Sequence, residues 1–147
     1  LALRRVFSYV WDPVAQKGGG LPRLQLFEVN GRFSLGPTNV VPVPLLHRTH
    51  PILGYRLDNF AYLTDCSAIP DCSWSLLEGI ETLVLDALRH RPHPTHFTLE
   101  QAVEAAARIG ARRTYFTHMC HDLPHAETNA VLPDGVQLAY DGLVLQL

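Results

Sequence analysis

The sequence predicts an α/β chain built on a mixed β-sheet with helices on one face. Strand pairs that read as hairpins fill the first half, and a strand–helix–strand pattern begins near residue 81. Hairpins give antiparallel neighbours, whereas a β-α-β unit requires at least two parallel neighbouring strands. With 147 residues, of which 47% are hydrophobic, the chain is long enough to bury a core of about one domain.

Five segments of the first half have the β-rich composition of strands: residues 24–29, 32–35, 40–46, 53–57 and 60–64. Asn30-Gly31 is a strong hairpin signal that joins the first pair, and Asp58-Asn59 joins the last pair. The third segment contains two prolines, which predict an edge or irregular position because proline has no N–H for a ladder. The glycine-rich residues 17–22 are predicted to form a turn rather than a domain linker, since strand-like sequence resumes at once.

The second half is expected to form a β-α-β unit followed by a hairpin. Residues 81–86 and 113–117 are short apolar runs typical of buried strands. Between them, Thr98 and Gln101 have the spacing of a capping box, and Gly110 predicts the helix end. The expected buried face of this helix consists of Leu99, Val103, Ala106 and Ala107. The last hairpin is expected from residues 136–140 and 143–147, around Asp141-Gly142.

Composition argues against several classes of protein. A net charge of −2, without a Lys/Arg-rich face, leaves no electrostatic footprint for nucleic acid. Cys66, Cys72 and Cys120 fit no C-x-x-C spacing, which argues against a disulfide framework or a cysteine zinc site and indicates reduced thiols in the cytoplasm. No apolar run approaches the ~20 residues of a membrane span. Because the chain has neither a signal-peptide layout nor an initiator Met, we expect it to begin inside a longer protein or after a cleavage.

Three predicted strands end on a side chain that can bind a metal: His47, Asp65 and His118. In sheets covered by helices, ligands gather outside the carboxyl ends of the strands. Imidazole and carboxylate are the non-thiol ligands of zinc, and both also suit manganese or iron. Each residue alone also fits an ordinary role, a loop or core histidine or an Asp that caps a turn. Spacing alone does not decide between these interpretations.

The chain contains eight histidines, a surplus that points weakly to metal or acid–base chemistry. His90, His93 and His96 recur every three residues, but the prolines between them forbid a regular helix. His90 and His93 are therefore interpreted as residues of a polar loop that leads into the capped helix. His121 and His125 are interpreted as solvated or supporting residues. No phosphate-binding glycine loop and no Gly-x-Ser-x-Gly elbow occurs.

Several blocks, in this order along the chain, carry a resemblance to a known family: residues 42–47, 51–57, 60–67, 83–89, 93–102 and 113–123. They include Gly54-Tyr55-Arg56, Thr64-Asp65-Cys66-Ser67 and the Thr-His-x-x-His run that begins at Thr117. Together they resemble the metallo-β-lactamase superfamily. Within it, the branch that contains the cyclic-phosphate phosphodiesterase of phosphonate catabolism is the most similar, and the tRNA 3′-processing endonuclease is more distant.

The resemblance implies a fold, a cofactor and a set of roles. The fold would be an αβ/βα sandwich of two similar halves, and residues 1–147 would be its C-terminal half. His47 would bind a first divalent metal ion, Asp65 would bridge two, and His118 would bind the second, with zinc or manganese as the metal. His96 would be the catalytic residue that donates a proton or stabilises the phosphate. The implied reaction is hydrolysis of a small cyclic or linear phosphodiester by metal-activated water.

One departure from the family is large. The family's His-x-His-x-Asp-His hexapeptide, which supplies most metal ligands, does not occur in this chain. We therefore expect the site to be completed by a missing N-terminal half or by a second chain, and the fragment alone to be inactive. Two alternatives stay open: a non-catalytic half-domain that binds a partner, including a second copy, through its uncovered sheet, and a thioesterase or glyoxalase-type hydrolase. Neither a membrane nor nucleic acid is an expected partner.

Overall fold

The computed structural model describes residues 2–12, 14 and 22–146, and the chain divides into two compact units, Leu1–Asn30 and Gly31–Leu147. In the first unit, α1 (Ala2–Val6) and η1 (Ser8–Val10) are followed by an extended segment whose Leu24 carbonyl accepts a hydrogen bond from Trp11 Nε1 at 3.2 Å. The strand predicted at residues 24–29 is not formed, so the expected Asn30-Gly31 hairpin is wrong. Most of the turn predicted at residues 17–22 lies outside the described residues.

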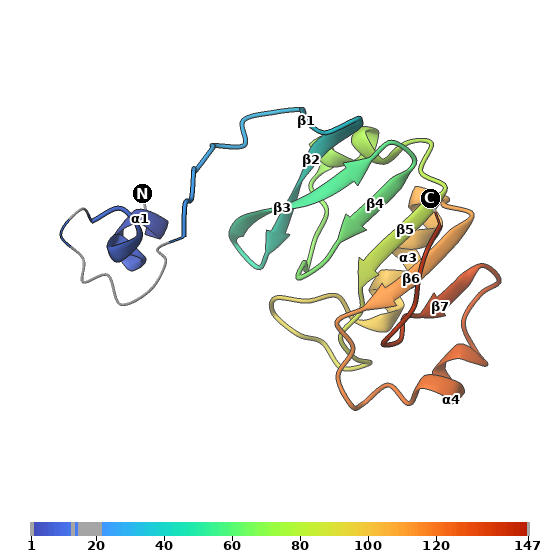
Figure 1. The fold of residues 1–147 in the computed structure, drawn as a ribbon. Helices are drawn as coiled ribbons and strands as arrows, with labels where there is room; N and C mark the ends of the chain where they lie inside the picture. Colours follow the sequence, from blue (N-terminus) through green and yellow to red (C-terminus); the bar gives the residue numbers. More distant parts are fainter. Residues whose placement is uncertain (1, 13, 15–21, 147) are drawn as a thin grey trace. The chain divides into compact units, whose positions relative to one another are not determined.

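The second unit is a mixed sheet, as the sequence predicted (Figure 1). Among the described residues, seven strands lie in the order β1 to β7: Phe33–Leu35, Thr38–His47, His50–Leu57, Phe60–Leu63, Thr82–Asp86, Arg113–Thr117 and Val136–Leu138. The pairs β1–β2, β2–β3 and β3–β4 are antiparallel, and the pairs β4–β5, β5–β6 and β6–β7 are parallel. The remaining helices of this unit are α2 (Asp71–Trp74), η2 (Ser75–Leu77), α3 (Leu99–Ile109) and α4 (His125–Asn129).

The antiparallel half, β1 to β4, contains one of the two hairpin turns that the sequence predicts for the first half of the chain. The turn at Asp58-Asn59 forms as predicted, with Leu57 paired to Phe60. β1 does not pair backwards through Asn30-Gly31 and instead turns at Gly36, which has a φ of 58°, so that Leu35 faces Thr38. Since β1 is short and pairs only with residues 38–40, the prolines of β2 lie beyond its reach, in agreement with the edge-like position expected for them.

The parallel half is built around α3, whose ends are those that the sequence predicts. Thr98 and Gln101 form a complete capping box, and Gly110 closes the helix in the left-handed region with a φ of 73°. One detail of the predicted face is wrong, because Ala107 is exposed while Ala102 and Ala105 are buried beside Leu99 and Ala106. β5 and β6, on either side of α3 in sequence, are parallel neighbours, which confirms the β-α-β unit.

The core lies between α3 and one face of the sheet; all five residues of β5 are buried, whereas burial alternates along β4. Ala61 and Leu63 of β4 are fully buried, whereas Tyr62 between them points to the opposite face and is 42% exposed. Leu53 lies on that same second face and is 40% exposed, while Gly54 beside it is buried. The second face of the antiparallel half is therefore partly open.

The C-terminal segment differs from the prediction. β7 ends at Leu138 instead of Tyr140, and residues 143–146 form no strand, so the expected last hairpin is wrong. β7 instead joins the sheet in parallel beside β6, after the short helix α4, and its backbone is held by the Asn129 side chain, which accepts from Leu138 N at 2.8 Å. None of the helices in the described residues combines the length and apolar character that a bilayer crossing requires.

Candidate metal centre and histidine cluster

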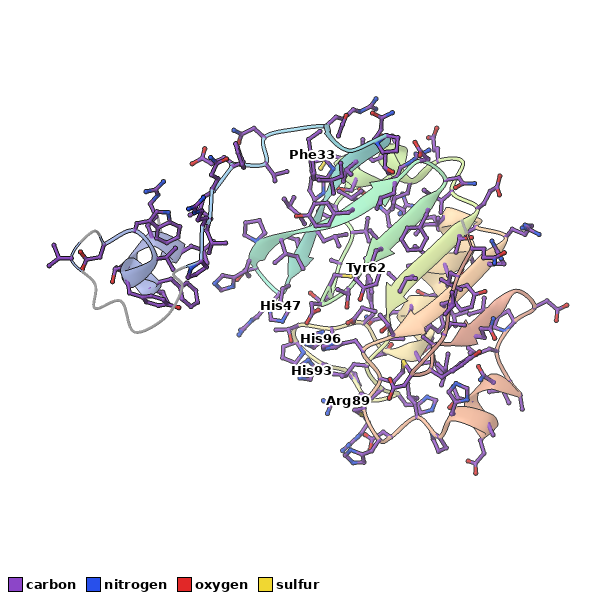
Figure 2. The ribbon with its side chains drawn as sticks, viewed as in Figure 1. Phe33, His47, Tyr62, Arg89, His93 and His96 are labelled. Carbon is purple, nitrogen blue, oxygen red and sulfur yellow. The ribbon has the colours of Figure 1, made fainter. Side chains whose placement is uncertain are left out.

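The strand topology brings the predicted metal-binding residues to one edge of the sheet. β2 and β4 are each antiparallel to β3, so they run in the same direction, and β5 and β6 are parallel to β4. The carboxyl ends of these four strands therefore meet at the same edge. His47 is the last residue of β2, Asp65 lies two residues beyond β4, and His118 follows β6 directly. Figure 2 shows His47 at this edge, close to His96 and His93.

The side chains at this edge form a close cluster. Asp65 Oδ1 lies 3.5 Å from Nε2 of His118. Ligand atoms of Asp65, His96 and His118 all lie within 4.8 Å of one another. The His47 ring meets the His96 ring edge-on, with centroids 5.1 Å apart, and the His118 ring is tilted against His96 at 4.6 Å. The fold thus brings together all four residues singled out from the sequence, but the tightest donor set includes His96 in place of His47.

Backbone strain is concentrated at the same edge. Four non-glycine residues of the described chain have left-handed φ angles, and three of them are Arg48 (59°), Asp65 (58°) and His118 (65°). Side chains with a Cβ rarely adopt this conformation, which costs of order 1 kcal/mol and persists where surrounding structure holds it. Two of the three are the predicted ligands themselves and the third follows His47. Such strain gathers at functional sites more often than at ordinary turns.

Asp86, the last residue of β5, holds this edge together and had no assigned role in the sequence analysis. Its buried carboxylate accepts three hydrogen bonds: from Asp65 N at 3.2 Å, from Phe97 N at 3.1 Å and from His96 Nδ1 at 3.3 Å. Burial raises the pKa of Asp86 to about 6, against the opposing effects of His118 and the two backbone N–H groups. The sequence feature that could have identified Asp86 is an apolar strand, residues 82–85, followed by a carboxylate. Like the predicted ligands, this carboxylate stands at the carboxyl end of its strand.

The contact with Asp86 fixes the orientation of His96. Nδ1 of His96 lies 3.3 Å from Asp86 Oδ1, and an ionised carboxylate can only accept, so with Asp86 ionised Nδ1 carries the proton and Nε2 keeps its lone pair. Burial, followed by nearby His118 and His47, lowers the pKa of His96, which favours this neutral form. A neutral imidazole oriented in this way can accept a proton at Nε2 or bind a metal, and a carboxylate on its other nitrogen is typical of both uses.

The other titratable residues near the edge are less suited to chemistry. Burial raises the pKa of the Cys66 thiol far above its ordinary value, so this cysteine is not a nucleophile. Cys72 is exposed and Cys120 is half-buried. His90 is exposed, and His125 Nε2 approaches the Leu138 carbonyl at 3.3 Å, a supporting contact. Cys120, His121 and Asp122 form a second close group, but Asp122 is paired with Arg91 at 2.9 Å.

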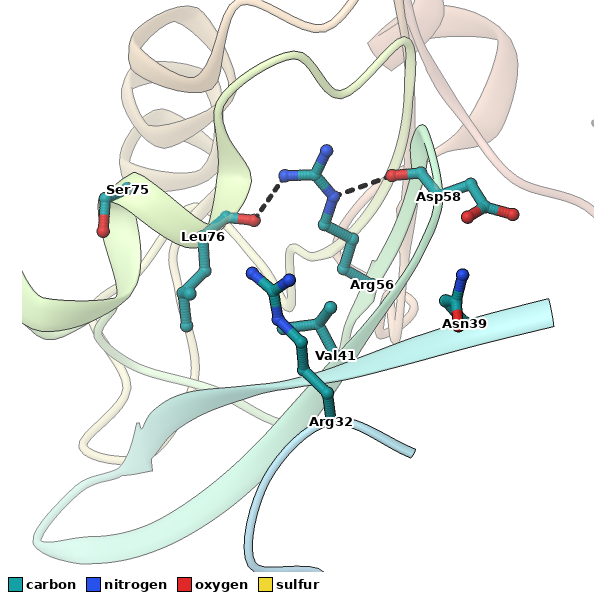
Figure 3. Close-up of a pocket in the computed structure, with 7 residues that line it drawn as sticks. All are labelled: Arg32, Asn39, Val41, Arg56, Asp58, Ser75 and Leu76. Carbon is teal, nitrogen blue, oxygen red and sulfur yellow. Dashed lines mark hydrogen bonds between the residues drawn. The ribbon is translucent and has the colours of Figure 1, made fainter. Parts of the chain in front are cut away.

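A cavity of about 430 Å³ lies elsewhere in this unit and contains no reacting group (Figure 3). Arg56 lines it and donates to the carbonyl oxygens of Asp58, Leu76 and Glu78 at 2.7–2.8 Å. These bonds tie the β3–β4 turn to the η2 segment. Arg56 therefore acts as a structural clamp, and we place the chemistry at the histidine cluster instead.

The comparisons with known proteins concern the family and the fold of this chain. A family model described as the beta-lactamase superfamily domain matches residues 2–119. Among solved structures, the chain is similar to a diphosphatase from the PhnP family, with 47% identity and a TM-score of 0.82 over 99% of this chain and 54% of that one. A curated octanoyltransferase from Porphyromonas gingivalis is 35% identical over 128 residues, which make up 84% of this chain and 26% of the relative.

Two more distant likenesses concern the fold alone. The metallo-beta-lactamase fold protein YhfI from Bacillus subtilis is 19% identical with a TM-score of 0.65, over 80% of this chain and 53% of that one. The short form of human tRNase Z is 20% identical with a TM-score of 0.57, over 82% of this chain and 45% of that one. The chain thus spans about half the length of these structures and about a quarter of the octanoyltransferase.

Proposed function

This chain belongs to the beta-lactamase superfamily, and from that membership we propose that it is the C-terminal half of a metal-dependent phosphodiesterase. The substrate would be a small cyclic or linear phosphodiester. The observation that carries the proposal is the convergence of Asp65, His96 and His118 at one sheet edge, with donor atoms within 4.8 Å of one another. Membership alone fixes a hydrolase fold, whereas this donor set is what the proposed chemistry requires.

Divalent metal ions fit the imidazoles of His47 and His118 together with the carboxylate of Asp65, since imidazole and carboxylate suit zinc and manganese. The exposed side of Asp65 and His118 leaves room for further ligands. In the proposal, His47, Asp65 and His118 would hold the metal ions. A pair of such ions lowers the pKa of bound water and stabilises the attacking and leaving oxygens of a displacement at phosphorus.

The chain's own residues would then bind and move protons. His96 presents Nε2 to the site, where it can neutralise negative charge on the phosphate and exchange a proton with the leaving oxygen. Since the unliganded ring is neutral, donation requires a bound phosphate anion to raise its pKa. Asp86 is a positioning residue: it touches neither substrate nor product, but it fixes the His96 tautomer and the Asp65 backbone.

The open second face of the sheet supports the need for a partner half. Tyr62 and Leu53 are apolar side chains about two-fifths exposed, on a face that a sandwich would cover. We infer that the N-terminal half, or a second chain that replaces it, lies on this face and supplies the remaining metal ligands. The rival function, a half-domain that only binds a partner, uses the same face but predicts no tightly bound metal.

Acyl transfer is the second rival, because one relative is an octanoyltransferase. The matched part is only 26% of that relative, so its name describes a protein most of which has no counterpart here. A covalent acyl carrier also needs an activated nucleophile, and the thiol at this edge, Cys66, is buried with a raised pKa. We therefore favour phosphodiester hydrolysis over acyl transfer; thioester hydrolysis by metal-activated water is separated by the experiment below.

The test uses His96→Ala in the full-length protein that carries this chain, with His90→Ala as the control from the same loop. We expect hydrolysis of cyclic AMP, whose alkoxide leaving oxygen needs a proton, to fall about 10²–10⁴-fold, as for a lost acid–base group, with bound metal retained. The control should keep its activity. A thioester as the better substrate, insensitive to His96→Ala, would refute the phosphodiesterase. Loss of metal in His96→Ala would instead make His96 a ligand.

A further inference from the structure

The loop that joins β5 to α3 carries a second histidine toward the site and is held in shape by its own backbone. Arg89 and Thr98 at its two ends form a β-bridge, and Leu88 N donates to the Phe97 carbonyl at 3.0 Å. Within the loop, the Arg89 guanidinium donates to the carbonyl oxygens of Arg91 and Pro92 at 3.2 and 3.1 Å. These bonds define the path of the chain into His93. The position of this side chain is therefore fixed by the loop.

His93 lies against the catalytic histidine. Figure 2 shows His93 beside His96. The two ring centroids are 5.0 Å apart with a tilt of 32°, and the His96 and His118 rings have the same tilt with centroids 4.6 Å apart. His96 thus lies between His93 and His118, and His118 is the proposed metal ligand of the three. The sequence interpretation of His93 as an ordinary polar loop residue is incomplete for this reason, since the loop delivers it to the site.

The hydrogen bonds of His93 leave it one free donor. Its Nδ1 lies 3.0 Å from Thr95 Oγ1 and 3.4 Å from Thr95 N, which donates to it. A ring nitrogen that accepts from a backbone N–H carries no proton, so the proton of neutral His93 is on Nε2. Within the described residues, no hydrogen bond to Nε2 is formed. Partial burial, and then the positive charge of Arg89, lower the pKa of His93, in keeping with this neutral donor form.

We propose that His93 is a substrate-contacting residue that binds a second phosphoryl group through its Nε2–H. The inference rests on the proposed function: if the scissile phosphorus lies between Asp65, His118 and His96, the group beyond it, on the side of His96 away from His118, meets His93. A phosphate oxyanion suits a neutral N–H donor with the Arg89 charge nearby. The site would therefore favour diphosphate diesters over diesters of a single phosphate, and His93 would determine that preference.

The experiment compares His93→Ala, His93→Gln and the control His90→Ala in the full-length protein. The probes are diadenosine diphosphate and bis-p-nitrophenyl phosphate as substrates. For His93→Ala we expect KM for diadenosine diphosphate to rise about tenfold or more, the usual effect of losing a hydrogen bond to a charged group. KM for bis-p-nitrophenyl phosphate should change less than about twofold, and His93→Gln, whose amide nitrogen can replace Nε2, should recover most of the loss.

A binding measurement separates this inference from the proposed function. Calorimetric titration with inorganic diphosphate and inorganic phosphate should show weaker diphosphate binding in His93→Ala, by about tenfold, with phosphate binding unchanged. If the protein hydrolyses neither ester but this difference in binding holds, the phosphodiesterase fails and the diphosphate contact stands. Equal losses for both anions, or none for either, overturn the role of His93, whatever the activity.

Discussion

Replacing Asp86 tests how the chain orders its reactive edge. The carboxylate is buried and accepts from two backbone N–H groups, of Asp65 and Phe97, and from the His96 ring. Asp86→Ala leaves Asp65 N without a partner, whereas Phe97 N still donates to the Cys66 carbonyl at 2.9 Å. We therefore expect a loss of about 1–3 kcal/mol in the free energy of unfolding, the usual effect of one unsatisfied N–H group. Asp86→Asn retains an oxygen that can accept from Asp65 N and should lose less, about 1 kcal/mol.

The effect on activity should exceed what lost stability explains. Without Asp86, the His96 ring loses the partner that fixes its tautomer, and loss of such a supporting carboxylate typically costs about 10–100-fold in activity or metal affinity. The assay is phosphodiester hydrolysis by the full-length protein at a temperature where the variant stays folded, alongside urea denaturation. Asp71→Asn, an exposed acidic residue of α2, is the matched control and should change neither.

Asp86→Asn carries the decisive comparison because it folds more easily. If its hydrolytic rate equals that of the wild-type protein and of Asp71→Asn, the carboxylate does not position His96 and the reasoning is refuted. If the rate of Asp86→Asn falls but excess metal restores it, Asp86 acts by ordering the metal ligands, through Asp65, and does not act by orienting His96.

Three further predictions concern packing, exposure and the open face. Gly54→Ala should destabilise the protein by about 1–3 kcal/mol in urea denaturation, because a Cβ there would lie 2.6 Å from Leu63 Cδ2; an unchanged midpoint would contradict the tight packing of β3. Alkylation of the native protein should label exposed Cys72 readily and buried Cys66 only after unfolding, as read by peptide mass spectrometry, and equal labelling would refute the burial. Tyr62→Asp should lower the full-length protein's free energy of unfolding by about 2 kcal/mol or more if a partner half covers this face, whereas a change below about 0.5 kcal/mol would leave it solvent-exposed.

The sequence was sufficient for the parts of the site that depend on strand direction. His47, Asp65 and His118 lie at the carboxyl end of a strand or within two residues after it. Because strands that run in the same direction end at the same edge of a sheet, these local patterns predicted that the three residues lie close together. The capping box at Thr98 was equally local and therefore predictable. The fold class followed from the change from hairpins to a strand–helix–strand pattern.

The failures have a common physical cause, since each depended on contacts between distant parts of the chain. Asn30-Gly31 favours a hairpin locally, but the segment before it packs with Trp11 and β1 pairs forward. Asp86 looked like the end of a buried strand, and only the folded chain brings Phe97 N and His96 to its carboxylate. His93 was discounted because prolines exclude a helix, yet a non-helical loop delivers it to the same place.

Elemental analysis of the purified full-length protein measures whether Asp65, His118 and His47 hold metal ions, as we propose. We expect about two equivalents of a divalent transition metal in the wild-type protein. Asp65→Ala and His118→Ala should each lose metal clearly, with His90→Ala unchanged. Substoichiometric metal in the wild-type protein, or full metal content in both ligand variants, would contradict this proposal.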